Sequence, residues 1–123
     1  MNVLIVDDNE AAADLLQELL SLQDHQAHCS YTAQQAIDAS TTQRFDAALV
    51  DLTLPDFPGT EVARRLRSAA GDQPLLLVAI SGFSVQDAPG AEARELFDHY
   101  LQKPIDFDAL DRILAAPGAH APA

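Results

Sequence analysis

Cysteine is almost absent from this chain of 123 residues, because Cys29 is its only one. An internal disulfide is therefore excluded, and nothing in the composition calls for an oxidising compartment. Cys29 lies in a predicted strand, where a lone thiol more often serves as a small core residue than as a reactive group. We expect it to pack against the core rather than to react.

Positive charge is also scarce. Seven lysine and arginine residues stand against 19 acidic residues, which gives a net charge of −12 at pH 7. Nucleic-acid-binding surfaces need a basic patch, so we expect no nucleic-acid partner. Arg64, Arg65 and Arg67 lie close together on one predicted helix. A solvated helix face explains them better than an anion-binding patch, which nothing else in the sequence supports.

Long hydrophobic runs are absent as well, and we expect no signal peptide. The longest unbroken apolar run is too short to cross a bilayer. The chain enters an apolar strand pattern within its first residues, without the basic and apolar regions of a signal peptide. We therefore expect no insertion into a membrane and a cytoplasmic location.

The chain does contain a regular alternation of strand and helix patterns. We expect strands near residues 2–6, 27–30, 46–50, 75–80 and 100–102. Helices are expected from the cap Asn9 to Asp24–His25, after the cap Thr32, near 60–69, between 84 and 96, and from Asp106. Strict alternation calls for right-handed crossovers and a parallel sheet, and continuous apolar strands indicate a sheet covered on both faces. Periodicity leaves the order of the strands open.

The length of the chain allows one domain with a substantial core, and not two. We expect this domain to cover residues 1–115. The remaining residues, 116–123, are rich in proline, glycine and alanine, and we expect them to form a tail or a linker stub.

Polar residues follow four of the predicted strands: Asp7–Asp8, Asp51, Ser81 and Lys103–Pro104. In an open parallel sheet, ligands bind outside the carboxyl ends of the strands, so these residues should meet at one edge. Three carboxylates this close repel one another unless a cation lies among them, and hard oxygen ligands select Mg²⁺ or Mn²⁺. The set suits the handling of a divalent cation and a phosphoryl group. Helix capping by Asp7–Asp8 and loop capping by Asp51 are the plainer explanations.

These residues resemble, in order and spacing, the receiver domain of bacterial two-component response regulators. The matching pieces are 3–9, 49–55, Gly59, 79–82 and Lys103–Pro104, and the resemblance extends over about 2–115. It implies an α/β fold of flavodoxin-like type: a five-stranded parallel sheet in the order 2-1-3-4-5 between two layers of helices, five in all. The stretch 96–110 is similar to receivers fused to hybrid sensor histidine kinases.

The resemblance also implies the role of each acid. Asp51 would accept the phosphoryl group, as carboxylates do in enzymes that form an aspartyl phosphate. Asp8 and Asp51 would bind Mg²⁺ or Mn²⁺ directly, together with the backbone carbonyl of Thr53, and Asp7 would act through water. The donor would be a phospho-histidine of a sensor histidine kinase or a histidine phosphotransfer protein. The downstream target stays unknown.

Further roles are implied for residues near the later strands. Lys103 would pair with the phosphoryl oxygens, and Pro104 and Gly59 would be structural. Ser81 and Tyr100 would form a switch that reshapes the face made by the fourth helix, the fifth strand and the fifth helix. We expect a signalling receiver that catalyses only its own phosphorylation and slow dephosphorylation.

Three other functions fit the sequence less well. A hydrolase with an aspartyl-phosphate intermediate usually has a second aspartate two residues after the nucleophile, where this chain has Thr53. A phosphorylation-independent binding module commonly lacks the acids and the lysine that this chain keeps. A flavodoxin-like electron carrier needs a phosphate loop rich in Thr, Ser and Gly after the first strand, and none is found there.

Overall fold

The fold is built on a sheet of five parallel strands, ordered β2-β1-β3-β4-β5. The structure, a computed structural model, describes residues 2–52, 59–71, 73–81, 97–102 and 105–115. The strands are β1 (Asn2–Val6), β2 (Gln26–Ser30), β3 (Ala47–Asp51), β4 (Leu76–Ser81) and β5 (His99–Gln102). This confirms the order that the resemblance implied. It also places side by side the two strands that lead to Asp7 and Asp51.

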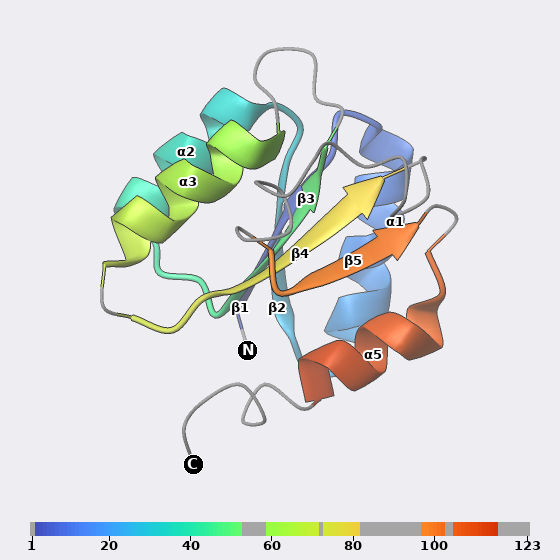
Figure 1. Cartoon of the computed structure of the whole chain (residues 1–123). Coiled ribbons are helices and arrows are strands. Elements are labelled where there is room, and N and C mark those ends of the chain that lie inside the picture. Colours follow the sequence, from blue (N-terminus) through green and yellow to red (C-terminus); the bar gives the residue numbers. More distant parts are fainter. Residues whose placement is uncertain (1, 53–58, 72, 82–96, 103–104, 116–123) are drawn as a thin grey trace.

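Helices cover both faces of the sheet (Figure 1). On one face lie α2 (Ala33–Thr42) and α3 (Gly59–Ala70), and on the other lie α1 (Glu10–Ser21) and α5 (Phe107–Ala115). The range predicted for a fourth helix, 84–96, lies outside the described residues. Among the helices that are described, none combines the length and the apolar character needed to traverse a bilayer.

Alternate residues of the central strands pack into two separate cores. Leu4 and Val6 of β1 pack with α2 and α3, whereas Val3 and Ile5 pack with α1 and α5. β1 and β3 are therefore buried on both faces, which explains why their sequences are almost continuously apolar. The interior strand predicted near residues 46–50 is confirmed.

Both ends of α1 and the start of α2 follow the sequence expectations. The side chains of Asn9 and Thr32 each accept a backbone N–H of the first helical turn, at 3.2 and 3.1 Å. Asp24 adopts a left-handed φ of 65°, and the N–H of His25 donates to the carbonyl of Leu20 at 3.1 Å. This arrangement is a Schellman-type turn, so Asp24 and His25 end α1 as predicted.

Two strands extend one residue further than predicted. β3 ends at Asp51 and β4 ends at Ser81, because Asp51 pairs with Ile80 and Ser81 pairs with Gln102. The apolar pattern predicted the end of each strand at its last apolar residue, but backbone pairing does not depend on side-chain polarity. As a result, the backbones of Asp51 and Ser81 are fixed by the sheet itself.

Candidate functional site

Asp51 is the last residue of β3 and is only 2% exposed. The chain that follows stays attached to the sheet, because the N–H of Leu52 donates to the carbonyl of Ile80 at 2.9 Å. The carboxylate of Asp51 is therefore presented from a rigid position at the carboxyl edge of the sheet.

Asp7 follows β1 and is fully buried. Its backbone N–H donates to the carbonyl of Ser30 at 3.1 Å, which holds the chain beside β2 for one further residue. Its Oδ1 accepts the N–H of Asn9 at 2.9 Å. Because Asn9 also caps α1, one short turn fixes both the orientation of Asp7 and the start of the helix.

Asp8 lies between Asp7 and Asn9 and is exposed. The three acids Asp7, Asp8 and Asp51 each offer a carboxylate oxygen, and these oxygens lie within 4.8 Å of one another. The predicted meeting of the acids at the carboxyl edge is therefore observed. Asp8 gives the cluster a side that is open to solvent, from which an ion or a phosphoryl donor can reach it.

The donor set fits a small divalent cation. Mg²⁺ holds its oxygen ligands at about 2.0–2.1 Å, so two direct ligands lie within roughly 4.2 Å of each other. The observed limit of 4.8 Å is close to this separation and leaves room for one acid to act through water. Burial of two like charges is unfavourable, and a cation among them relieves that repulsion.

Gly59 begins α3 directly against the segment that follows the acceptor. A Cβ atom at this position would lie 2.7 Å from the Cα of Leu52 and 2.9 Å from the carbonyl oxygen of Asp51. Only glycine allows so close an approach. This contact supports the structural role that the resemblance implied for Gly59.

Several residues expected at the site lie outside the described part of the chain. These are Thr53, Lys103 and Pro104. The backbone of Ser81 ends β4, but its side chain is not described, so its hydroxyl stays a prediction.

Tyr100, the other expected switch residue, lies in β5 and packs against the α2–α3 side of the sheet. Its ring meets the ring of Phe97 edge to face, with the two centroids 5.9 Å apart. Tyr100 is thus partly buried and packs against the core, and its movement on phosphorylation stays a prediction.

The structure adds a feature that the sequence analysis missed. An apolar groove of about 280 Å³ lies beside Asp7 and is lined by Ala12, Leu15, Leu16, Leu19, Ile105 and Phe107. Leu15 is 56% exposed, which is unusual for a large apolar side chain. The leucines at positions 15, 16 and 19 could have indicated the groove, but an apolar helix stripe normally signals core packing.

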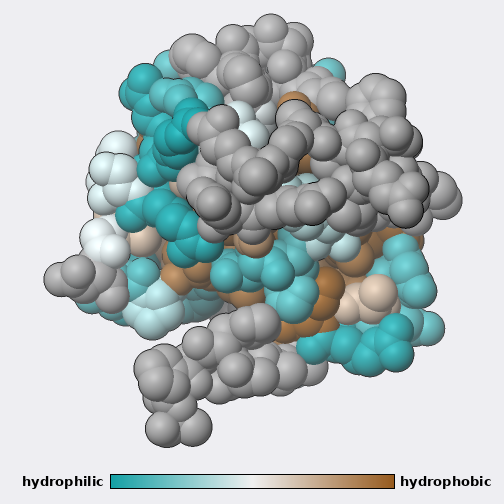
Figure 2. All heavy atoms as spheres, in the orientation of Figure 1, coloured by the Kyte–Doolittle hydropathy of each residue, from teal (hydrophilic) through white to brown (hydrophobic). Residues whose placement is uncertain are grey.

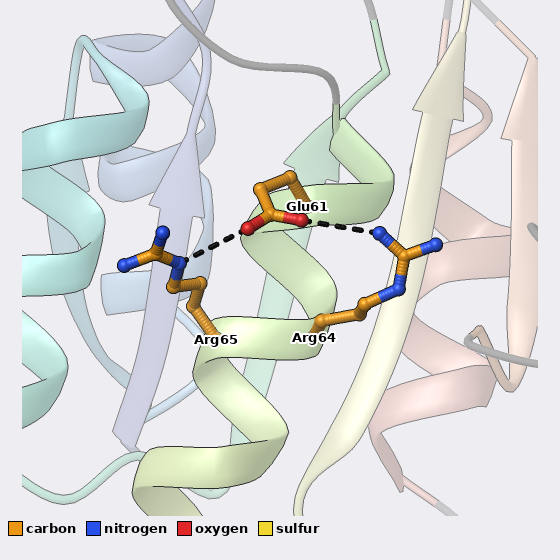
Figure 3. A network of polar contacts seen from close by, with 3 residues as sticks. All are labelled: Glu61, Arg64 and Arg65. Carbon is orange, nitrogen blue, oxygen red and sulfur yellow. Dashed lines mark hydrogen bonds and ion pairs between the residues drawn. The ribbon is translucent and has the colours of Figure 1, made fainter.

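The arginines of α3 behave as a solvated helix face. Arg64 and Arg65 both contact Glu61, each at 3.1 Å (Figure 3). The hydrogen bond from Arg65, which has the larger effect, and the one from Arg64 both lower the pKa of Glu61. Arg67 contacts Asp98 at 3.2 Å. In the space-filling view, teal hydrophilic residues lie together with pale residues of intermediate hydropathy on the α2–α3 side of the molecule (Figure 2).

Cys29 is partly buried and packs against the core shared with α1 and α5. Its thiol donates to the carbonyl of Ala13 at 3.4 Å, and burial raises the pKa of the thiol. A raised pKa keeps the reactive thiolate scarce, so the expectation of a packing role for Cys29 agrees with its surroundings.

Residues 3–115 match the family model of the response regulator receiver domain. The chain belongs to this family. The match spans all the strands and helices described above except Asn2, the first residue of β1. Receivers of this family act in two-component signalling, where sensor histidine kinases phosphorylate response regulators, and they are not enzymes in the ordinary sense of substrate turnover.

Curated relatives include the response regulator MprA of two mycobacteria. The response regulator MprA of Mycobacterium avium (strain 104) is 32% identical over 115 residues, and MprA of Mycobacterium bovis (strain BCG / Pasteur 1173P2) is 31% identical over 115 residues. Each match covers 94% of this chain and 48% of the relative. The receiver therefore spans about half the length of these curated relatives.

Solved structures agree in fold. A receiver domain from Methylobacillus flagellatus is 39% identical, with a TM-score of 0.88 over 95% of this chain and 98% of that one. The receiver domain of the sensor histidine kinase PA1611 from Pseudomonas aeruginosa PAO1 is 25% identical, with a TM-score of 0.81 over 92% and 93% of the two chains. That structure has a magnesium ion coordinated in its active site cleft.

Proposed function

We propose that Asp51 is the phosphoryl acceptor of a two-component phosphorelay. The donor is a phospho-histidine of a sensor histidine kinase or of a histidine phosphotransfer protein. The observation that carries this proposal is the gathering of Asp7, Asp8 and Asp51 within 4.8 Å at the carboxyl edge of the sheet. Three carboxylates this close repel one another, so we interpret the cluster as a binding site for a cation and a charged substrate.

The transfer is a displacement at phosphorus. A carboxylate oxygen of Asp51 forms a bond to phosphorus while the bond from phosphorus to the donor imidazole nitrogen breaks, and the electron pair returns to the imidazole. An acyl phosphate remains on Asp51, and water later hydrolyses it. Because β3 and the contact from Leu52 to Ile80 hold the acceptor in place, the attacking oxygen is oriented before the donor arrives.

Charge has to be compensated in this step. Mg²⁺, or Mn²⁺ in its place, would supply the positive charge that lets a phosphoryl group approach the acids. Asp8 and Asp51 would hold the ion directly with the backbone carbonyl of Thr53, and Asp7 would hold it through water. Lys103 would pair with the phosphoryl oxygens as a point charge.

The effect of phosphorylation would be transmitted through β4 and β5. Asp51 pairs with Ile80 of β4, next to Ser81, and Ala79 of β4 pairs with Tyr100, so β4 lies between the acceptor and β5 and carries one of the switch residues. A phosphoryl group adds about −1.5 to −2 charges with strong acceptor oxygens, which Ser81 would approach. Tyr100 would then repack against Phe97 and alter the face around β5 and α5.

The apolar groove beside Asp7 supports the identity of the donor as a protein. It combines the exposed Leu15 and the half-buried Leu19 of α1 with Phe107, which begins α5, and Ile105 just before it. We place the apolar side chains of the donor protein in this groove, because the transferred group has to reach Asp51 next to Asp7.

Phosphorylation of the isolated chain tests the proposal. We expect acetyl phosphate with Mg²⁺ to add one phosphoryl group, seen by intact mass, and we expect Asp51→Asn or chelation of the metal to prevent this. Asp38→Asn, which changes an acid on α2, should behave as wild type. Phosphorylation that persists in Asp51→Asn would overturn the assignment of the acceptor. Rapid turnover of small phosphate esters would instead indicate a hydrolase.

A further inference from the structure

A cavity of about 270 Å³ lies at the opposite edge of the sheet from the acids. It opens between the last turns of α2 and α3, whose carboxyl ends lie side by side on one face of the sheet (Figure 1). The loops that lead into β3 and β4 form its rim, with Arg44 from one loop and Gln73 from the other. It therefore shares no residue with the proposed phosphorylation site.

The deep part of the cavity is apolar. Leu4 and Ala48 of the central strands form its floor, and Leu66 of α3 and Phe45 form its walls. Leu4 and Ala48 are completely shielded from water, so the cavity ends on the closed surface of the core. Ala69 is exposed at the side of the cavity, where a larger residue would take up its space.

The hydroxyl groups along the α2 wall are already engaged. Ser40, Thr41 and Thr42 donate to carbonyls three residues earlier in the helix, at 2.7, 2.7 and 3.2 Å. The carbonyl of Ala39 also accepts the backbone N–H of Gln43 at 2.9 Å, so these hydroxyl donors are used within the helix. The donors left for a ligand are therefore those of the rim.

Arg44 has that capacity. In the described part of the chain its partner is the neutral side-chain amide of Gln73, whereas Arg64, Arg65 and Arg67 each contact a carboxylate. A guanidinium has five N–H donors, and the bond to Gln73 uses one nitrogen. Arg44 thus offers an uncompensated positive charge at the mouth of an apolar cavity.

We propose that this cavity binds a small organic carboxylate. The apolar part of the ligand lies in the cavity beside Phe45, Leu66 and Ala69, and its carboxylate forms a two-pronged pair with Arg44, a geometry that suits a guanidinium. The volume corresponds to roughly nine water molecules at about 30 Å³ each, which is the size of a six-carbon acid. The inference does not depend on the proposed phosphorylation.

Hexanoate is the probe, and backbone amide NMR spectra of the full chain are the measurement. We expect saturable shifts confined to the segments 43–45 and 66–71, and much weaker effects from hexanol and hexylammonium at equal concentration. Arg44→Gln should weaken hexanoate binding by about tenfold or more, because a hydrogen bond to a charged group is lost. Arg112→Gln, an exposed arginine on α5, should leave binding unchanged.

A second variant tests the contribution of the cavity volume separately from that of the charge of Arg44. Ala69→Leu puts bulk into the rim of the cavity without touching Arg44, and should also reduce binding; Ser68→Leu, an exposed neighbour outside the cavity, should not. Equal binding of hexanol and hexanoate would refute a carboxylate site. So would hexanoate shifts that both Arg44→Gln and Ala69→Leu leave intact, or the absence of saturable shifts.

Discussion

Aspartates lie at both edges of the same sheet, and their carboxylates have different surroundings at the two edges. At the amino-terminal edge, Asp46 accepts the N–H of Asn2 at 2.7 Å, and Asp98 accepts the N–H of Leu77 at 2.9 Å. Arg67 adds a contact of 3.2 Å to Asp98. Each of these carboxylates joins the start of its strand to a neighbouring strand, so each has a structural task.

At the carboxyl-terminal edge the aspartates gather with one another. Asp7, Asp8 and Asp51 bring three like charges within 4.8 Å, and two of the three are buried. Such a cluster costs stability until a cation arrives. The residue type alone therefore does not reveal the role of an aspartate at a strand end. The groups around its carboxylate determine whether it stabilises the fold or binds a ligand.

The largest expected effect comes from removing one charge at the carboxyl edge. Asp51→Asn keeps the size of the side chain, abolishes phosphorylation, and in Mg²⁺-free buffer should raise the free energy of unfolding by roughly 1–3 kcal/mol, because repulsion among the acids is relieved. Urea denaturation with and without Mg²⁺ measures this. A loss of stability in Asp51→Asn would show that the charge of Asp51 is structural, and would break the contrast between the edges.

Glycine substitutions compare the two ends of α3. Gly59→Ala should cost about 2–3 kcal/mol, because the added Cβ meets the backbone of Leu52 and Asp51. Gly71→Ala, at the other end, meets nothing within 4 Å and should cost about 1–2 kcal/mol from its φ of +61° alone.

Phosphorylation distinguishes these two causes. We expect a slower reaction of Gly59→Ala with acetyl phosphate, since the shifted backbone carries Asp51, and a normal rate for Gly71→Ala. Equal rates in the two variants would mean that the contact of Gly59 with Leu52 does not position the acceptor.

Much of this arrangement could be predicted from the sequence, because it depends on local patterns. The caps Asn9 and Thr32 and the apolar strands are visible in short windows, and the resemblance supplied the order of the strands. The contacts of Asp46 and Asp98 could not be predicted, because their partners lie on other strands and the register is a property of the folded sheet. The cavity beside Arg44 was missed for the same reason.

Removal of an amino-edge carboxylate should have the opposite sign to removal of one at the carboxyl edge. Asp98→Ala should lower the free energy of unfolding by about 1–2 kcal/mol, because the N–H of Leu77 and the guanidinium of Arg67 both lose their acceptor. Asp98→Asn keeps an acceptor for Leu77 and should cost less. Urea denaturation of the two variants is the measurement, and a stabilised Asp98→Ala would contradict the structural task given to this residue.

The smallest expected effect concerns Glu61, an acid in the first turn of α3 that lies beside two arginines. Hydrogen bonds from Arg65 and Arg64 lower the pKa of Glu61 in the folded state, so its stabilising contribution is complete above its unfolded value of about 4.3 and is lost as pH falls through the folded value. Wild type should therefore be slightly more stable than Glu61→Gln at pH 6, and the two should converge in acid. Glu18→Gln, on the exposed side of α1, is the matched control and should show no such convergence. If the difference in stability between wild type and Glu61→Gln grew in acid instead, Glu61 would not form an ion pair with Arg64 and Arg65 in the folded state. The charges of these two arginines would then be available to other partners.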